Sequence, residues 1–166
     1  MSKTQIPTGG IADDAVTAAK ATGFGKILQV VSASLTTQKS TSSTSFVDTD
    51  LTCNITPSAT SSKILVVISQ HNSVNRASSL ARGQVQVLRD STVIFTPNSW
   101  TINMQQTGSD LAHSTMLSFN YLDSPSTTSQ VTYKTQMKAD TSTNILVSQN
   151  GHESTIVLME VGAWAE

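Results

Sequence analysis

Short runs of apolar residues, most of them rich in Val and Ile, recur from residue 26 almost to the end of the chain. The runs follow one another at a spacing of about 8–12 residues, and Gly, Pro, Ser and Thr fill the gaps between them. Some of the runs alternate strictly, as in LTCNIT, where Leu51, Cys53 and Ile55 share one face. Repeated short strands with no helix among them predict an all-β, antiparallel β-sandwich, and about eight to ten strands suit a jelly roll.

The expected strands can be placed on the sequence, with boundaries set by turn residues. They lie at 26–35, 45–48, 51–56, 63–71, 115–123, 130–138, 143–149 and 154–161, with a hairpin over 83–97 that turns at Asp90 and Ser91. The clearest alternation places Val131, Tyr133, Thr135 and Met137 on the inner face of one strand, and Leu117, Phe119 and Tyr121 on one face of another. KILVVISQH, residues 63–71, is so continuously apolar that we expect a central strand covered on both faces. The polar span from Pro97 to Ala112 is expected to be the longest loop, and residues 36–45 a loop or an extended edge.

The surface of such strands is short of charge and rich in hydroxyl groups. Charged residues make up 13% of the chain and hydrophobic residues 37%, while Ser and Thr together number 49. Faces coated with hydroxyl groups can pack against an identical copy without burying ions, so we expect a homo-oligomer. The net charge of -1, without any run of Lys or Arg, argues against nucleic-acid binding. No apolar segment is long enough to insert across a membrane.

The segment GGIADDAVTAAKATGFG, residues 9–25, predicts a helix instead of a strand. Asp13 and Asp14 favour its first turn, and Gly23 favours its end. Small and apolar side chains form a narrow stripe at helical spacing: Ile11, Ala15, Val16, Ala18, Ala19 and Thr22. About twelve residues are marginal for a lone helix, so we expect helices of several copies to bundle along this stripe. The alternative is a frayed, partly extended arm.

Patterns that carry catalytic or metal chemistry are weak in this sequence. His71, His113 and His152 lie too far apart to form a spaced metal site, and the sequence has neither a P-loop nor a nucleophile elbow. Asp48 and Asp50 lack the further ligands of a calcium loop and are interpreted as a solvated turn. We therefore predict a protein that is not an enzyme and that uses no metal and no cofactor.

Trp100 lies within the long polar span, close to Asn98 and Asn103. An exposed indole among amides and hydroxyls can stack on a sugar or on a protein partner. Trp100, Asn98 and Asn103 are therefore the candidate ligand-binding residues. The alternative is that Trp100 anchors its own loop.

Four stretches of the sequence together reach from Ile11 to Ala163. They are IADDAVTAAK, GKILQVVSASLTT, STSFVDTDLTCNITPSATSSKILVVIS and STIVLMEVGA. They resemble the carboxy-terminal head modules of tail-fibre and related virion fibre proteins of tailed bacteriophages. The resemblance implies a homotrimer, with neck helices gathered on a threefold axis and heads packed side by side, and it carries over no catalytic residue. Because the alanine stripe is small, the heads are expected to supply most of the contact between copies.

The same resemblance implies a phage virion structural protein, assembled in the host cytoplasm, which acts as a short trimeric fibre or knob. It divides the chain into an N-terminal docking arm and neck helix, residues 1–25, and a β-sandwich head, residues 26–166. The candidate residues for docking on other virion proteins are Thr4, Gln5, Ile6 and Pro7. The expected host partner is a surface glycan or protein. Two alternatives stay open: a trimeric capsid decoration protein, and a free carbohydrate-binding module.

Overall fold

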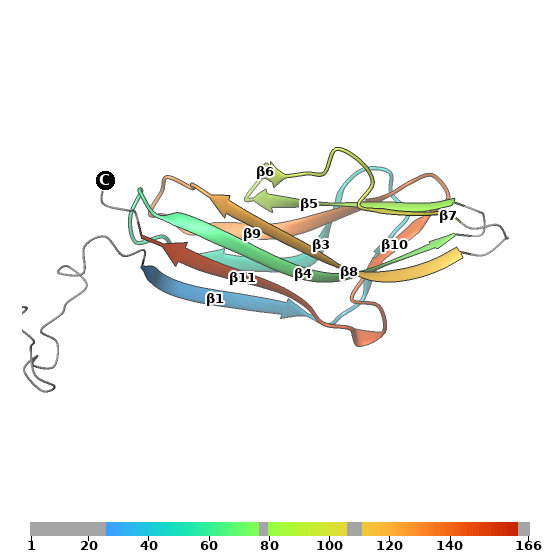
Figure 1. Cartoon of the computed structure of the whole chain (residues 1–166), viewed down its shortest axis with the longest axis horizontal. Coiled ribbons are helices and arrows are strands. Elements are labelled where there is room, and N and C mark those ends of the chain that lie inside the picture. Colours follow the sequence, from blue (N-terminus) through green and yellow to red (C-terminus); the bar gives the residue numbers. More distant parts are fainter. Residues whose placement is uncertain (1–25, 77–79, 106–110, 163–166) are drawn as a thin grey trace, which may run out of the picture.

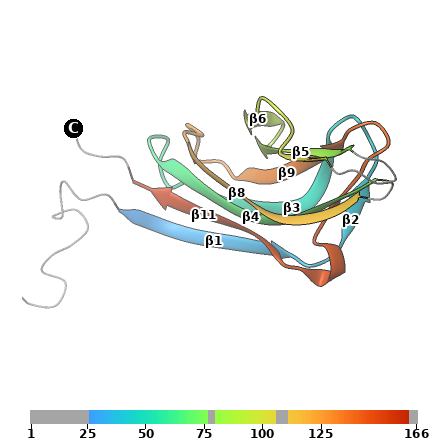
Figure 2. The same cartoon turned by 45° about the vertical axis from the view of Figure 1, so that its right-hand side comes forward.

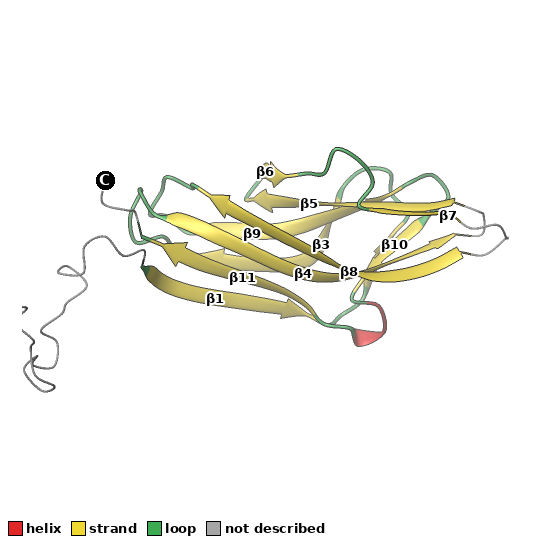
Figure 3. Ribbon diagram, viewed as in Figure 1, coloured by secondary structure: helices red, strands yellow, loops and turns green. Residues whose placement is uncertain are grey.

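Two antiparallel β-sheets packed face to face make up the part of the chain that the computed structural model describes, residues 26–76, 80–105 and 111–162 (Figures 1 and 3). Sheet A contains β1 (Ile27–Leu35), β2 (Lys39–Thr41), β4 (Lys63–Arg76), β8 (Leu111–Asp123), β10 (Asn144–Val147) and β11 (Ser154–Val161). Sheet B contains β3 (Val47–Ile55), β5 (Leu80–Arg89), β6 (Thr92–Phe95), β7 (Ile102–Gln105) and β9 (Val131–Ala139). A short 3-10 helix, η1 (Gln149–Gly151), precedes β11.

The order of the strands within the two sheets is that of a jelly roll. Sheet A runs β1-β11-β4-β8, with β10 taking the place of β11 beside the second half of β4 and β2 pairing with β10. Sheet B runs β3-β9-β5, and β6 and β7 share the far side of β5. Because β3, β4 and β5 alternate between the sheets, the chain winds around the core (Figure 2). The antiparallel sandwich is therefore confirmed. The arm and neck helix fall on residues outside the described ones, and the trimer stays a prediction.

The core lies between the sheets, where the inward sides of the alternating strands meet. On β9, the predicted inner set from Val131 to Met137 is buried at every second position. On β3, Leu51, Cys53 and Ile55 are buried as well, so the period-two pattern identified the core face of both strands. Two apolar clusters result, one containing Ile68 and the other containing Ile145.

A buried chain of polar side chains lies between the two clusters along β4 and β9. Thr135 Oγ1 donates to Gln70 Oε1 at 2.6 Å, and Gln70 Nε2 donates to Asn72 Oδ1 at 2.9 Å. Thr49 Oγ1 donates to the carbonyl oxygen of Thr135 at 3.1 Å. All four side chains are fully buried. Because the bond from Thr135 to Gln70 crosses from sheet B to sheet A, this chain helps to fix how the sheets lie on each other as well as satisfying buried polar groups.

The structure corrects three of the expected boundaries. The strands expected at 45–48 and 51–56 are one strand, β3, which bends at a bulge where Asp50 has a φ of 74°. The longest expected loop contains β7, because Ile102 is buried against the core and draws the polar residues around it into pairing with β5. Strands β4 and β8 are longer than expected, since polar residues such as Asn72 find buried partners. The hairpin turn at Asp90 is confirmed.

Strand β4 is central in sheet A, as its apolar run predicted, but one of its two faces is only partly covered. Ile64, Val66 and Ile68 point into the core and are buried, whereas Leu65 and Val67 on the opposite face are half-buried. The expectation that both faces are covered is therefore wrong for the described part of the chain. The outer face of sheet A keeps apolar side chains that the head itself does not bury.

Both carboxylates on the strands of sheet A are turned inward, and the first of them ties the two sheets together. Asp123, on β8, accepts hydrogen bonds from Arg89 Nη1 and from the Tyr133 hydroxyl, each at 2.7 Å. Burial first, and then the hydrogen bond to Asp123, raise the pKa of Tyr133. The ion pair with Arg89 joins β8 of sheet A to β5 of sheet B, and the hydrogen bond from Tyr133 joins β8 to β9.

The second inward carboxylate, Glu160 on β11, holds the loop that follows β3. Glu160 Oε1 accepts hydrogen bonds from the backbone N–H and the hydroxyl of Ser58, at 2.7 and 2.6 Å, and Oε2 accepts one from Gln29. Burial by itself raises the pKa of Glu160, but the hydrogen bonds outweigh it and lower the pKa to about 2. Glu160 is therefore ionised inside the head and leaves no carboxylate on the outer face of sheet A.

Candidate functional site

The residues predicted to bundle the neck and to dock on a virion lie outside the described part of the chain. They are Ile11, Ala15, Val16, Ala18, Ala19 and Thr22 for the neck, and Thr4, Gln5, Ile6 and Pro7 for docking. These assignments stay predictions. The other predicted site residues, around Trp100, lie on or beside sheet B, where the structure defines their surroundings.

Trp100 packs against two cationic side chains on the outer side of sheet B. The guanidinium carbon of Arg82 lies 5.1 Å from the centroid of the indole, and Lys138 Nζ lies 5.5 Å from it. Arg82 also pairs with Asp140, with Nη2 and Oδ2 2.5 Å apart, and Lys138 lies 4.7 Å over the ring of Phe46. Trp100 is half-buried by this packing. These contacts favour the interpretation of Trp100 as the anchor of its loop.

The loop between β6 and β7 is fastened to β5 by its backbone. Gln84 Nε2 donates a hydrogen bond to the carbonyl oxygen of Pro97 at 2.7 Å. Asn103 is exposed on β7 and lies opposite Arg82 in the ladder between β5 and β7. The structure thus brings Asn103 and the indole together at Arg82, while Asn98 lies exposed on the same loop.

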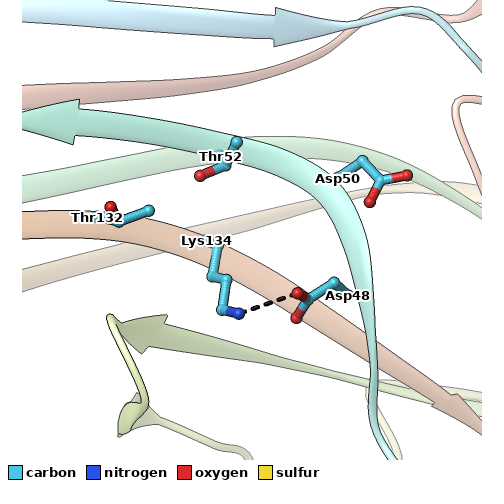
Figure 4. Close-up of a pocket in the computed structure, with 5 residues that line it drawn as sticks. All are labelled: Asp48, Asp50, Thr52, Thr132 and Lys134. Atoms are coloured by element: carbon cyan, nitrogen blue, oxygen red, sulfur yellow. Dashed lines mark hydrogen bonds and ion pairs between the residues drawn. The ribbon is translucent and has the colours of Figure 1, made fainter.

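A pocket of about 310 Å3 opens on the outer face of sheet B between β3 and β9 (Figure 4). Its lining residues are Asp48, Asp50, Thr52, Thr132 and Lys134. Lys134 Nζ and Asp48 Oδ2 lie 2.9 Å apart across it, and Asp50 points away from this pair (Figure 4). The lining of the pocket therefore combines the ion pair of Lys134 and Asp48 with the hydroxyls of Thr52 and Thr132.

Both aspartates of the pocket are paired. Asp48 precedes the bulge of β3 and Asp50 lies within it, so the two residues belong to a strand and the expected solvated turn is wrong. Asp48 accepts a second hydrogen bond from Gln136 Nε2 at 2.7 Å, and Asp50 lies 2.6 Å from Lys39 Nζ. Burial raises the pKa of Asp48, but the bonds from Gln136 and Lys134 outweigh it and lower the pKa overall. Within residues 26–76, 80–105 and 111–162, no three His, Cys, Asp or Glu side chains gather as metal ligands would.

The outer face of sheet A has a different chemistry. Four apolar side chains cross it at neighbouring register positions, one on each of four adjacent strands, and we call them the apolar row. They are Val30 of β1, Met159 of β11, Leu65 of β4 and Leu122 of β8. Val30 and Leu122, at its two ends, are 55% and 52% exposed, and the middle two are half-buried. Large apolar side chains left half in water at adjacent positions mark an interaction surface.

The rows beside the apolar row are apolar or carry hydroxyl and amide groups. Ile27, Val161 and Lys63 form the row on one side; Ser32, Val157, Val67 and Asn120 form the row on the other, followed by Ser34, Thr155, Ser69 and Ser118. Over these rows of the described face, Lys63 is the one Lys, Arg, Asp or Glu, and its Nζ donates to Ser124 Oγ at 3.1 Å. The sequence contained the signal, since 63–71 and 154–161 are apolar at odd and even positions alike. For residues 63–71 this pattern predicts a central strand covered on both faces.

Two histidines lie on the same face, further from the start of β1. The rings of His71 and His152 are stacked, with centroids 4.4 Å apart. The backbone N–H of His71 donates to Ser154 Oγ at 3.0 Å, and the side chain lies opposite Met116 in the ladder with β8. Burial first, and then the neighbouring His152, lower the pKa of His71. The buried imidazole is therefore neutral at pH 7.

No family model matches the sequence, and no curated protein matches it. Similar solved structures include the VP2 subviral particle of infectious bursal disease virus, with 12% identity and a TM-score of 0.39 over 81% of this chain and 40% of that chain. The structure of the Gx strain of this virus gives 13% identity and a TM-score of 0.39, over 82% and 38%. The chain thus spans about two fifths of the length of these proteins. Among the described residues, no helix has the length and apolarity to cross a membrane.

Proposed function

We propose that this protein is a structural subunit of a phage virion, a short trimeric fibre or knob attached to the particle through its N-terminal residues. The observation that carries the proposal is the nearly uncharged outer face of sheet A, which has the chemistry of an assembly surface. The four stretches that resemble fibre heads, and a jelly-roll order of strands around a well-filled core, support it as well.

The charged groups of the described head favour a structural role over catalysis. On sheet B, Lys134 pairs with Asp48 and Arg82 pairs with Asp140, and inside the sandwich Asp123 pairs with Arg89. Groups held in this way stabilise the head and are not poised to exchange protons with a substrate. A monomer that relied on its surface for solubility would carry charge on both outer faces, whereas in the described head the outer face of sheet B carries nearly all of it.

The location of the protein can be tested by immunogold electron microscopy of purified particles. Label confined to the tail or its collar is the expected result. Label spread over the whole capsid would replace the fibre by a decoration protein, and particles without label would contradict the virion role. Pre-adsorbed antibody serves as the control for stray label.

A variant without residues 1–22 tests the attachment. We expect its head to stay folded and oligomeric by light scattering, and to be absent from purified particles. Normal incorporation of the truncated protein would contradict docking through the N-terminal residues. A truncated protein that ran as a monomer would assign the contact between copies to the neck rather than to the heads.

A further inference from the structure

Exposed apolar side chains of the described head are concentrated on the outer face of sheet A. Of the seven large apolar side chains that the head leaves exposed, four occupy this face: Ile27, Val30, Met116 and Leu122. Half-buried neighbours such as Leu65 and Val67 join them across the strands. The result is a continuous surface instead of scattered single residues, and a continuous apolar surface indicates a partner.

We propose that copies of this chain meet through the outer face of sheet A, with the apolar row at the centre of the contact. The proposal rests on the proposed trimer and names the surface that forms it. In the assembly, Val30, Met159, Leu65 and Leu122 of one copy are buried against the neighbouring copies.

The chemistry of the face fits a second copy of itself. Apolar side chains of the row meet apolar side chains, and the hydroxyls of Ser32, Ser69 and Ser118 both donate and accept hydrogen bonds, so that identical rows can satisfy each other. The contact desolvates no carboxylate, because Asp123 and Glu160 are turned inward. A lipid surface or a nucleic acid would instead select a face rich in Lys and Arg.

The size of the face also fits contact between copies. Four strands about 4.8 Å apart, each contributing about nine residues at about 3.4 Å, give a flat area of roughly 500 Å2. The accessible surface of the side chains standing on it is larger, and a stable interface uses about 800 Å2 per partner. A stripe of alanines on a neck helix offers much less apolar surface, so the heads supply the larger part of the contact.

The position of the apolar row gives the assembly a direction. Val30 lies near the start of β1, Leu65 near the start of β4 and Met159 near the end of β11, so the row lies towards the end of the sandwich where β1 begins (Figures 1 and 2). Copies joined there have the starts of their β1 strands close together, as a shared attachment through the residues before β1 requires. The starts of β5 and β8, and β7, lie at the opposite end, which then points away from the particle (Figure 1).

Sedimentation velocity of the full chain over a dilution series in the micromolar range tests the surface. Val30→Glu combined with Leu122→Glu places carboxylates at both ends of the row, at sites exposed enough for a separate head to tolerate them. We expect association to weaken by about a hundredfold, towards a 17.6 kDa species, because like charges in a contact are strongly repelled. The matched control is Val93→Glu, which alters an apolar side chain 44% exposed on β6 of sheet B and should sediment as the wild type does.

A milder pair, Val30→Thr with Leu122→Thr, keeps strand-forming side chains and adds no charge, and we expect it to weaken association by about tenfold. It decides the question if circular dichroism shows that the glutamate pair does not fold. If a pair of substitutions that folds associates as strongly as the wild type, this surface is not the contact between copies. The trimer would then be held by another part of the chain. A wild type that sediments as a monomer would overturn both the surface and the trimer, and would show that some other part covers the row. Immunogold labelling of particles is independent of these outcomes, so a failure of the virion role would be seen separately.

Discussion

The two outer faces of the sandwich differ in whether they carry charged side chains. On sheet B, acidic and basic side chains stand on the surface and pair there, as Asp48 does with Lys134 and Arg82 with Asp140. On sheet A, the strands carry their carboxylates, Asp123 and Glu160, inward. Apart from Lys63 and the stacked histidines, the described outer side of sheet A is left to apolar, hydroxyl and amide groups. Both faces belong to one fold, so the fold alone does not explain the difference. The proposed contact between copies does explain it, because sheet A would then meet another copy while sheet B meets water.

The largest expected effect contrasts a buried ion pair with an exposed one. Asp123→Asn removes the negative charge that pairs with Arg89. The side chain of Arg89 is 23% exposed and that of Asp123 is 8% exposed. We expect a loss of about 3 kcal/mol in the free energy of unfolding, because a charge is left in the sandwich without its counterion. Denaturant unfolding at fixed protein concentration measures it.

The control for this substitution is Asp50→Asn, since Asp50 pairs with Lys39 on the surface with its side chain 61% exposed. Asparagine tolerates the left-handed backbone of this position, and an exposed pair contributes little, so the expected loss is below about 1 kcal/mol. Equal losses in the two variants would contradict the distinction between an ion pair turned into the sandwich and one exposed on its surface.

The next effect concerns Glu160, the other inward carboxylate. Its pKa is lowered to about 2 from an ordinary value of 4.5, so the unfolded chain binds a proton more readily than the folded one. The stability that the ionised carboxylate contributes is therefore complete above pH 4.5 and is lost as the pH falls towards 2. We expect Glu160→Gln to reduce the free energy of unfolding at pH 7 by about 2 kcal/mol and to flatten this acid loss.

Thermal unfolding followed by circular dichroism between pH 7 and pH 2 checks the Glu160 effect. Glu153→Gln is the matched control, because Glu153 is exposed and its substitution should leave the profile in place. If both variants lost stability in acid as steeply as the wild type, Glu160 would not be the group that holds the loop at Ser58.

A smaller effect is expected on the outer face of sheet B at Trp100. Trp100→Ala removes two cation–π contacts, yet Arg82 keeps its ion pair with Asp140, so no charge is orphaned. We expect a loss of about 1–2 kcal/mol in stability and an unchanged sedimentation coefficient, whereas Trp100→Phe should lose less. A glycan array probed with the same variants tests the ligand role: binding that Phe retains and Ala abolishes would support it, and binding unaffected by Ala would contradict it.

The sequence predicted the core face of a strand well wherever one side is apolar and the other polar. In β9 and β3 the alternation places Tyr133 and Cys53 inside, because a strand has only two faces and only one of them meets the core. The pattern fails where both sides are apolar, as in β4. There the described residues leave Leu65 and Val67 half-buried. Period-two reasoning does not say whether the same chain or another copy covers such side chains.

Contacts between distant segments lay beyond the sequence for a physical reason. Ser58 meets Glu160 across 102 positions, and Asp48 meets Lys134 across 86, at distances set by strand order and register. A one-residue slip would turn each of these side chains to the other face. The composition of the polar span that contains β7 predicts a loop. The span nevertheless forms a strand, because one of its residues, Ile102, is buried in the core.

The smallest expected effect lies on the outer face of sheet A, at the stacked pair of His71 and His152. Because burial and His152 lower the pKa of His71, the unfolded chain takes up this proton at a higher pH than the folded one. Stability is then complete above the ordinary pKa of 6.5 and declines as the pH falls below it. If the outer face joins copies, a proton on His71 also adds a positive charge to a contact in which the rows carry only that of Lys63, so association should weaken over the same range. Sedimentation and thermal unfolding from about pH 7.5 to about pH 5 measure both. His71→Asn should flatten both profiles and His113→Asn should leave them unchanged; a wild type that is flat over this range would contradict the role given to His71.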